Sequence, residues 1–101
     1  MARKSAIEKN DRRMKLVARY AALRKELKQK LLDTNLSDDE YFAAQRKLAK
    51  LPRSSSCVRI RNRCAVTGRA RGFHGFFGIS RIQLREMASF GEIPGITKSS
   101  W

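Results

Sequence analysis

The stretch RSSSCVRIRNRCAVTGRARGFHGFFGISRIQLR, residues 53–85, contains eight arginines and no lysine, aspartate or glutamate. A folded surface of this size normally mixes both signs of charge, because an unbalanced run repels itself. The guanidinium group binds phosphate through two parallel hydrogen bonds and also stacks on bases. The stretch therefore predicts a nucleic-acid contact surface. Its arginines are Arg53, Arg59, Arg61, Arg63, Arg69, Arg71, Arg81 and Arg85.

Glycines and aromatic residues alternate in the middle of this stretch. The glycines are Gly68, Gly72, Gly75 and Gly78, and the aromatic residues are Phe73, His74, Phe76 and Phe77. Rings on a flexible cationic loop stack on unpaired bases, but some of them must also close the small core of this region. The core position is favoured for Phe77, and both alternatives stay open for Phe73 and Phe76. Phe73 and His74 are candidate RNA contacts.

Four positions in this region have the spacing of a four-cysteine zinc site, C-x2-C-x12-C-x2-C. They hold Cys64, Thr67, Ser80 and Gln83, so only one of them is a thiol. Hydroxyl and amide groups are poor zinc ligands, and the sequence predicts no metal and no cofactor. Ser80 and Gln83 instead form a capping box. They predict a helix from Ser80 to Phe90, with Gly91 as its stop.

Residues 5–32 have the pattern of one long helix. Leucines and a tyrosine recur at steps of three and four and form a narrow apolar stripe. The stripe consists of Leu16, Tyr20, Leu23, Leu27 and Leu31. Residues 1–30 hold eleven basic and three acidic side chains. This excess predicts that the other faces lie along RNA backbone, with Arg3, Lys4, Arg12 and Arg13 as candidate contacts.

A second helix is expected from Ser37 to Lys50. Ser37 and Glu40 form a capping box, and three carboxylates occupy the first turn, where the helix dipole favours them. This role explains the acidic cluster better than a metal or acid–base site does. The inner face is predicted to consist of Tyr41, Ala44, Leu48 and Leu51, packed on the stripe as a helical hairpin.

Between the helical half and the glycine-rich half, Arg53 to Cys57 is predicted to be extended. Val58 to Cys64 alternates apolar and polar residues, which fits either a short strand or an extended strip that presents guanidinium groups and Asn62 to RNA. We expect a sheet of no more than two strands. The expected organisation is a basic helical extension (1–52), an extended arginine-rich linker (53–63) and a compact RNA-binding module (64–101).

Composition limits the class of protein. The chain has 101 residues, 32% of them charged and 42% hydrophobic, with a net charge of +14 and a pI near 10.9. These values predict one modest domain and a polyanionic partner. No apolar run approaches 18 residues and the first residues lack a secretory signal, so we expect a soluble intracellular protein with reduced cysteines. A single histidine, no nucleophile motif, no P-loop and no carboxylate pair in the basic half exclude an enzyme.

The second half of the chain closely resembles the bacterial-type small-subunit ribosomal protein fourteen family. The matching segments are Arg61 to Cys64, Thr67 to Arg69, Phe77 to Ile82, Arg85-Glu86 and Gly91 to Trp101. The first 50 residues match only in length, basic character and helical pattern. The resemblance is to the longer, zinc-free branch of the family. Two departures are Ala70, where the family usually has proline, and Gly75-Phe76, near which it commonly has basic residues.

This resemblance implies a structural role in the head of the small ribosomal subunit, in contact with the three-prime domain of its rRNA and with neighbouring head proteins. The ribosome is that of a bacterial cytoplasm or of an organelle of bacterial descent. The implied fold is mainly α with irregular extended segments, ending in a small degenerate zinc-ribbon-like module with one short helix. Lys98, in the matching tail, joins the candidate RNA contacts. The alternative is a free DNA- or RNA-binding regulator built on a degenerate zinc-ribbon, which would not co-sediment with ribosomal subunits.

Overall fold

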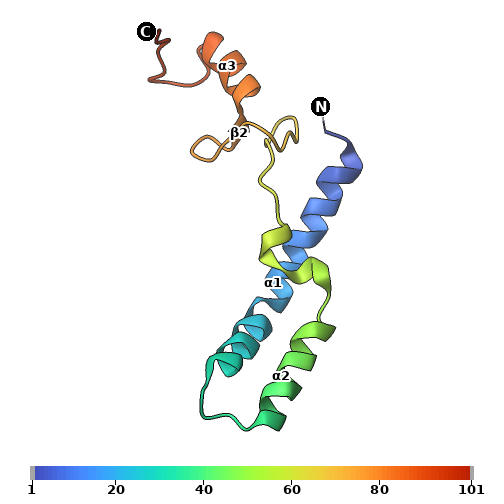
Figure 1. Cartoon of the computed structure of the whole chain (residues 1–101). Helices are drawn as coiled ribbons and strands as arrows, with labels where there is room; N and C mark the ends of the chain where they lie inside the picture. Colours follow the sequence, from blue (N-terminus) through green and yellow to red (C-terminus); the bar gives the residue numbers. More distant parts are fainter. Residues whose placement is uncertain (1, 101) are drawn as a thin grey trace. The chain divides into compact units, whose positions relative to one another are not determined.

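The computed structural model describes residues 2–100, and Trp101, whose packing partner the sequence does not decide, lies outside the described residues. The chain forms two compact units (Figure 1). One is Lys9–Ile60, and the other combines Met1–Glu8 with Arg61–Trp101. Helices dominate, accompanied by a two-stranded sheet and irregular segments, so the expectation of a mainly α chain is confirmed.

The first helix, α1, runs from Lys4 to Leu32 and confirms the predicted helix to within one residue. Leu27 is buried, with 3% of its surface exposed, and Leu16, Tyr20 and Leu31 are half-buried. Leu23 is 42% exposed, so its place in the buried stripe is wrong. At about 100° per residue, Leu23 lies at one edge of the stripe, where a single partner helix does not cover it.

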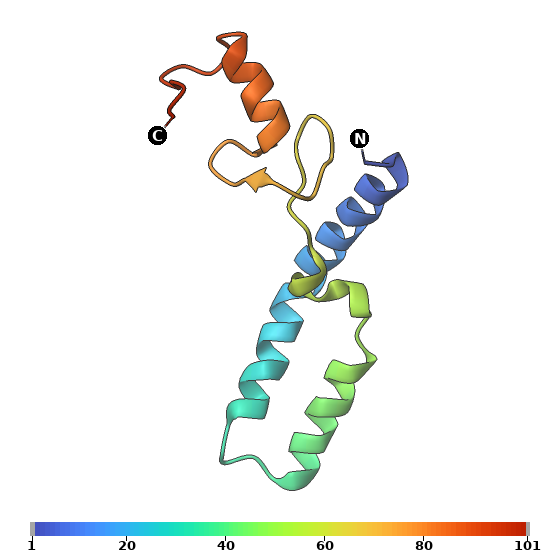
Figure 2. The same cartoon turned by 45° about the horizontal axis from the view of Figure 1, so that its top comes forward.

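The second helix, α2, spans Asp38–Lys50 and lies antiparallel beside the later part of α1 (Figures 1 and 2). The Ser37 side chain accepts a hydrogen bond from the backbone N–H of Glu40 at 3.4 Å, which confirms the predicted cap. Ala44 is 5% exposed and Leu48 is half-buried, as the hairpin requires. Tyr41 is 39% exposed, so its predicted position on the inner face is wrong; its ring packs edge-on against Phe42.

The segment after α2 is not extended, which corrects the prediction for Arg53 to Cys57. Two short 3-10 helices, η1 (Arg53–Ser55) and η2 (Cys57–Arg59), occupy it. Ser55 is the cause: its backbone N–H and its hydroxyl both donate to the carbonyl of Pro52. The Ser55 hydroxyl also accepts a hydrogen bond from Arg24 Nε at 2.9 Å. Ser55 is 1% exposed, so the turn is anchored to α1.

The sheet lies in the second unit and consists of β1 (Phe73–His74) and β2 (Ile79–Ser80), which pair antiparallel. The strand alternative for Val58 to Cys64 is wrong, because that segment contains η2 and then irregular backbone. Residues 75–78 connect the strands, and Gly78 N–H donates to the carbonyl of His74 at 2.8 Å. Gly78 has a φ of +70°, which glycine adopts without steric cost.

The third helix, α3, spans Arg81–Ser89. The Ser80 hydroxyl accepts from Gln83 N–H at 3.3 Å, and Gly91 follows the C-terminal cap with a φ of +73°, so both predicted ends are confirmed. Ile82 is 47% exposed, whereas Leu84 and Met87 are half-buried. No described helix combines the length and the apolar character that crossing a membrane requires.

Candidate nucleic-acid interface

A turn around Cys64 supports the arginines of the second unit. Cys64 N–H donates to the carbonyl of Arg69, and Gly68 N–H donates to the carbonyl of Cys64, each at 2.9 Å. Thr67 N–H points at the Cys64 sulfur from 3.5 Å. Burial raises the pKa of the Cys64 thiol, but hydrogen bonding by Thr67 and by other nearby backbone groups outweighs it and lowers that pKa to about 6. The turn is therefore a hydrogen-bonded unit around a buried thiol whose pKa is lowered.

The N-terminal residues pack on this turn, a contact that no local pattern predicts. Ala2 N–H donates to the carbonyl of Thr67 at 3.4 Å. A Cβ atom on Gly68, whose φ is +75°, would stand 2.5 Å from Cδ1 of Ile7. Position 68 thus requires glycine for two reasons: the left-handed backbone conformation and the close approach of the Ile7 side chain. The contact places Arg3 and Lys4, both exposed, in the same unit as the arginines of the turn.

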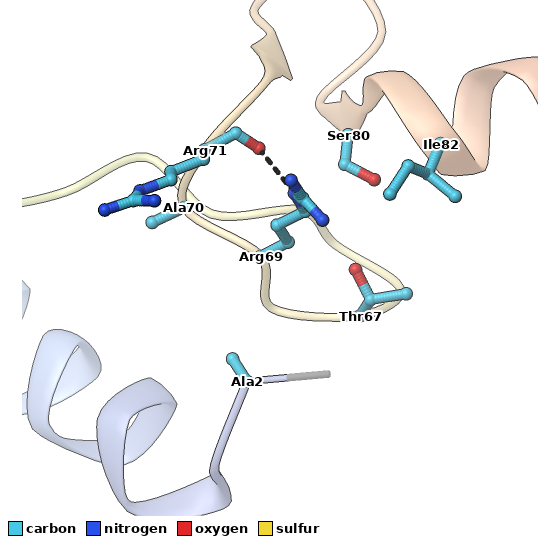
Figure 3. Close-up of a pocket in the computed structure, with 7 residues that line it drawn as sticks. All are labelled: Ala2, Thr67, Arg69, Ala70, Arg71, Ser80 and Ile82. Carbon is cyan, nitrogen blue, oxygen red and sulfur yellow. Dashed lines mark hydrogen bonds between the residues drawn. The ribbon is translucent and has the colours of Figure 1, made fainter.

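Arg69 and Arg71 line an open hollow of about 480 Å³ (Figure 3). Its remaining lining residues are Ala2, Thr67, Ala70, Ser80 and Ile82. Arg69 Nε donates to the carbonyl of Arg71 at 3.2 Å, which fixes the direction of the Arg69 side chain (Figure 3). Two predicted site residues thus meet at one concave surface, large enough for a phosphate group and its sugar.

Arg81, Arg85 and Lys98 line a second hollow of about 360 Å³, between α3 and the C-terminal tail. Arg81 and Arg85 lie about one turn apart on α3, and Lys98 from the tail completes the cluster. Arg81 also lies across the backbone of Gly72, since a Cβ atom at position 72 would stand 3.0 Å from Arg81 Cγ. Capping by Ser80 fixes the start of α3 and with it the position of Arg81.

Arg63 has a structural task as well as a charge. Its Nη1 donates to the carbonyl of Gly68 at 3.0 Å, and its Nε is buried without a hydrogen-bond partner among the described residues. The guanidinium group therefore helps to close the Cys64 turn. Its neighbours Arg61 and Asn62 are exposed on irregular backbone.

The aromatic residues of the hairpin divide into two groups. Phe73 is half-buried in β1, and His74 is exposed. Phe76 is 93% exposed and Phe77 37% exposed, so neither belongs to the core and the favoured core position of Phe77 is wrong. Their rings contact each other edge to face, with centroids 4.9 Å apart and an interplanar angle of 85°. Both rings lie on the connection between β1 and β2.

In the first unit, the predicted contacts Arg12 and Arg53 are exposed, and Arg13 and Arg59 are half-buried. An additional basic surface lies beside η1 and η2, at a hollow of about 350 Å³. Its basic residues are Arg24, Lys25 and Lys28, none of which the sequence reasoning selected, and the Arg24 guanidinium already donates to Ser55 and to the Pro52 carbonyl. Their spacing of one and three residues puts them on one side of α1, and the helical periodicity of the sequence could have identified them.

No cluster of three or more histidine, cysteine, aspartate or glutamate side chains suited to a metal occurs in residues 2–100. Within this range, Cys57 is an exposed free thiol and Cys64 a buried one. Ser80, at a position where the zinc spacing would require a ligand, is 1% exposed and caps α3. Its hydroxyl is thus engaged by the backbone of α3.

Comparison with known proteins identifies the family. The family model for ribosomal protein S14p/S29e matches residues 47–100. Proteins named small ribosomal subunit protein uS14 align with the whole chain over their own whole length: 55% identical in Opitutus terrae, 57% in Hyphomonas neptunium and 56% in Leifsonia xyli subsp. xyli. These matches confirm the resemblance found in the sequence. The chain belongs to the ribosomal protein S14p/S29e family.

Proposed function

We propose that this chain is a structural constituent of the small ribosomal subunit, where it binds the three-prime domain of the rRNA in the head and supports head assembly and translation. The observation that carries the proposal is full-length identity of 55% or more with proteins named for that subunit. The family is structural and not enzymatic. Its location is the ribosome, in a bacterial cytoplasm or in the matrix of an organelle of bacterial descent.

Phosphate binding is the main task of the second unit. The hollow of Arg69 and Arg71 and the hollow of Arg81, Arg85 and Lys98 are concave and basic, and each can seat backbone phosphates. In the described residues only Glu8, Glu86 and Glu92 oppose this charge within the unit. Guanidinium groups held in fixed directions bind phosphate with little loss of side-chain entropy. This unit, with the module of residues 64–101 at its centre, is the primary rRNA-binding part.

The helical unit adds a second basic surface. Arg12, Arg13, Arg53 and Arg59 carry the predicted contacts, and Lys25 and Lys28 extend them along α1. Residues 1–52 therefore act as a basic extension on rRNA, and the arginines of residues 53–63, which include Arg61 and Asn62, continue the contact. Phosphate contacts of this kind fix the position of the protein on the RNA and do not read the base sequence directly.

Base stacking is the task of the hairpin. Phe76 exposes nearly its whole ring at the hairpin end, supported edge-on by Phe77. A supported ring with a free face suits an unpaired base, and stacking is worth roughly 1–3 kcal/mol per base. Phe73 and His74 are the adjoining contacts, with His74 the more accessible of the two.

The test is binding of the purified full-length chain to an isolated three-prime-domain fragment of small-subunit rRNA, combined with co-sedimentation of the tagged chain from cells. We expect specific binding to the fragment and recovery in the small-subunit peak at moderate salt. The matched control is an RNA of the same length from the five-prime domain. Equal affinity for both RNAs, or a chain that stays at the top of the gradient, contradicts the proposal and favours a free regulator.

A further inference from the structure

The hollow beside η1 and η2 joins apolar and basic side chains. It measures about 350 Å³, and α1 forms one wall while the two 3-10 helices form the other. Both views show residues 53–59 beside the middle of α1 (Figures 1 and 2). The wall on α1 follows one helical stripe, which includes Val17, Ala21, Arg24, Lys25, Lys28 and Leu32. At about 100° per residue, this stripe is separate from the one that packs on α2.

The charge of this hollow is positive and unbalanced. Lys25 and Lys28 are exposed, and neither forms an ion pair among residues 2–100. No carboxylate lines the hollow. The segments 12–25 and 41–85, which supply most of both walls, hold no aspartate or glutamate. The hollow therefore attracts an anionic group.

The acidic residues next to the hollow in the sequence are engaged elsewhere. Glu26 follows Lys25 but forms an ion pair with Lys30, with the charged atoms 3.1 Å apart. Asp33 comes after α1, and its carboxylate accepts a hydrogen bond from the backbone N–H of Asn35 at 3.0 Å. Neither Glu26 nor Asp33 lines the hollow. The two lysines thus lack a partner that the helical unit itself could supply.

Arg24 contributes to the shape of the hollow more than to its charge. Its Nε donates to the Ser55 hydroxyl at 2.9 Å, and its Nη2 donates to the carbonyl of Pro52 at 3.3 Å. Because Ser55 is 1% exposed, these bonds hold η1 against α1 and join the two walls. The exposed Cys57 thiol belongs to the second wall.

We propose that this hollow binds one unpaired nucleotide of the rRNA, with the base against the apolar side chains and its phosphate at Lys25 and Lys28. This inference rests on the proposed function. Phosphate binding alone explains the lysines, but it does not explain Val17, Ala21 and the 82% exposed Leu32 on the same stripe. A base buries apolar surface against such side chains, and only an unpaired nucleotide can present its base in this way.

The surroundings favour RNA over an acidic protein segment as the occupant. The basic surface continues from the hollow to Arg53 on η1 and Arg59 on η2, two of the predicted rRNA contacts. A volume of about 350 Å³ is at the lower end of the range for small-ligand sites and suits a base with its ribose. One nucleotide supplies both the compact apolar group and the anion that the hollow requires.

The first test uses the native Cys57 as a reporter. Its thiol is exposed in the folded chain, so folding alone leaves it reactive, whereas Cys64 is 3% exposed. Labelling of Cys57 by iodoacetamide in the full-length chain should slow about tenfold when the three-prime-domain rRNA fragment is present at about ten times its Kd. Full reactivity in a complex that forms overturns the inference. Failure of the complex to form would instead refute the proposed function.

The second test fills the hollow. Ala21→Leu adds bulk where the base is expected and should lower the affinity for the fragment about fivefold or more, the value of a lost base contact. Ala22→Leu is the matched control, since Ala22 is also exposed on α1 but lies about 100° around the helix and does not line the hollow. Equal affinities would mean that RNA crosses the hollow without a base inside, which contradicts the inference.

The third test concerns the phosphate and the class of occupant. Lys25→Ala/Lys28→Ala should reduce the slope of log K against log salt by roughly 0.7–0.9, the value of one phosphate contact, and an unchanged slope overturns the inference. Lys30→Ala is the matched control, because Lys30 is paired with Glu26. In assembled subunits, a benzophenone side chain in place of Gln29, which lines the hollow, should cross-link to rRNA. A cross-link to an acidic protein segment also overturns the inference.

Discussion

The two units of this chain achieve order in different ways. The second unit is short of apolar contacts but dense in backbone hydrogen bonds: the Cys64 turn, the β1–β2 pair, the cap on α3 and five glycines with positive φ. The helical unit has regular helices, yet its buried apolar residues in the described range are only Leu27 and Ala44. This difference leads us to expect that the helical unit needs a partner to become ordered, whereas local hydrogen bonds support the irregular half.

The largest expected effect concerns folding of the free chain. Ordering costs roughly 1–2 kcal/mol per residue in backbone entropy, and two buried side chains do not offset it for a hairpin of this length. Hydrogen exchange at low salt should find weak protection for residues 16–48 and measurable protection for residues 64–91, with the former rising when rRNA is added. Strong protection of residues 16–48 without RNA would remove the distinction between the units.

A pH effect should be confined to the second unit. The Cys64 pKa is lowered to about 6 in the folded chain from 9.0. A group whose pKa is lowered by folding stabilises the folded chain fully at pH values above its pKa in the unfolded chain. This stabilisation is lost as the pH falls through its pKa in the folded chain. Between pH 6 and 9 the free energy of unfolding should rise by roughly 1 kcal/mol per pH unit.

Denaturant titrations monitored by hydrogen exchange in residues 64–91 measure this slope. Cys64→Ala should remove the slope. Cys57→Ser is the matched control, since Cys57 is exposed and belongs to the helical unit. A slope that persists in Cys64→Ala shows that another group titrates.

Replacement of glycine tests how far the Cys64 turn depends on its packing. Gly68→Ala should cost about 2–4 kcal/mol, because the left-handed backbone and the contact with Ile7 both oppose a Cβ atom. Gly91→Ala is the matched control: its φ is +73° but the space around it is open, so about 1–2 kcal/mol is expected. Thermal or denaturant unfolding measures both, and equal losses would show that the packing of Ile7 contributes nothing.

Removal of a helix cap should cost more stability in the second unit than in the helical unit. Ser80→Ala removes the cap of α3 from a position that is 1% exposed, and should cost about 1–2 kcal/mol. Ser37→Ala removes an exposed cap from α2, where water replaces the lost bond, and about 0.5–1 kcal/mol is expected in the RNA-bound state. A larger loss at Ser37 would indicate that α2 is the more self-sufficient element.

The smallest effect separates arginines that bind RNA from arginines that build the fold. Arg71→Ala should reduce the slope of log K against log salt by roughly 0.7–0.9, the value of one phosphate contact. Arg24→Ala should leave the slope nearly unchanged and instead weaken the η1 turn, because Arg24 donates to Ser55. Filter binding to rRNA at salt concentrations from about 50 to about 300 mM measures the slope for each variant. Equal slopes for both variants would contradict this division.

Local signals predicted the helices well, and nonlocal contacts account for the errors. Caps at Ser37 and Ser80 and the stop at Gly91 depend on residues within one turn, so the sequence pattern was sufficient. The 3-10 turn at Ser55 was missed because it depends on Arg24, 31 residues away. The role of Gly68 was missed for the same reason, since it depends on Ile7.

The sequence by itself determined the class of partner, the helix boundaries and the family, because net charge, capping residues and short motifs are properties of neighbouring residues. Only the tertiary structure decided which side chains remain accessible. Phe76 is exposed in the folded chain, whereas Phe73 is half-buried. Arg63 and Arg24 form hydrogen bonds within the fold. One hollow brings together Arg81, Arg85 and Lys98. Accessibility depends on what the distant parts of the chain cover, and that is fixed only when the chain has folded.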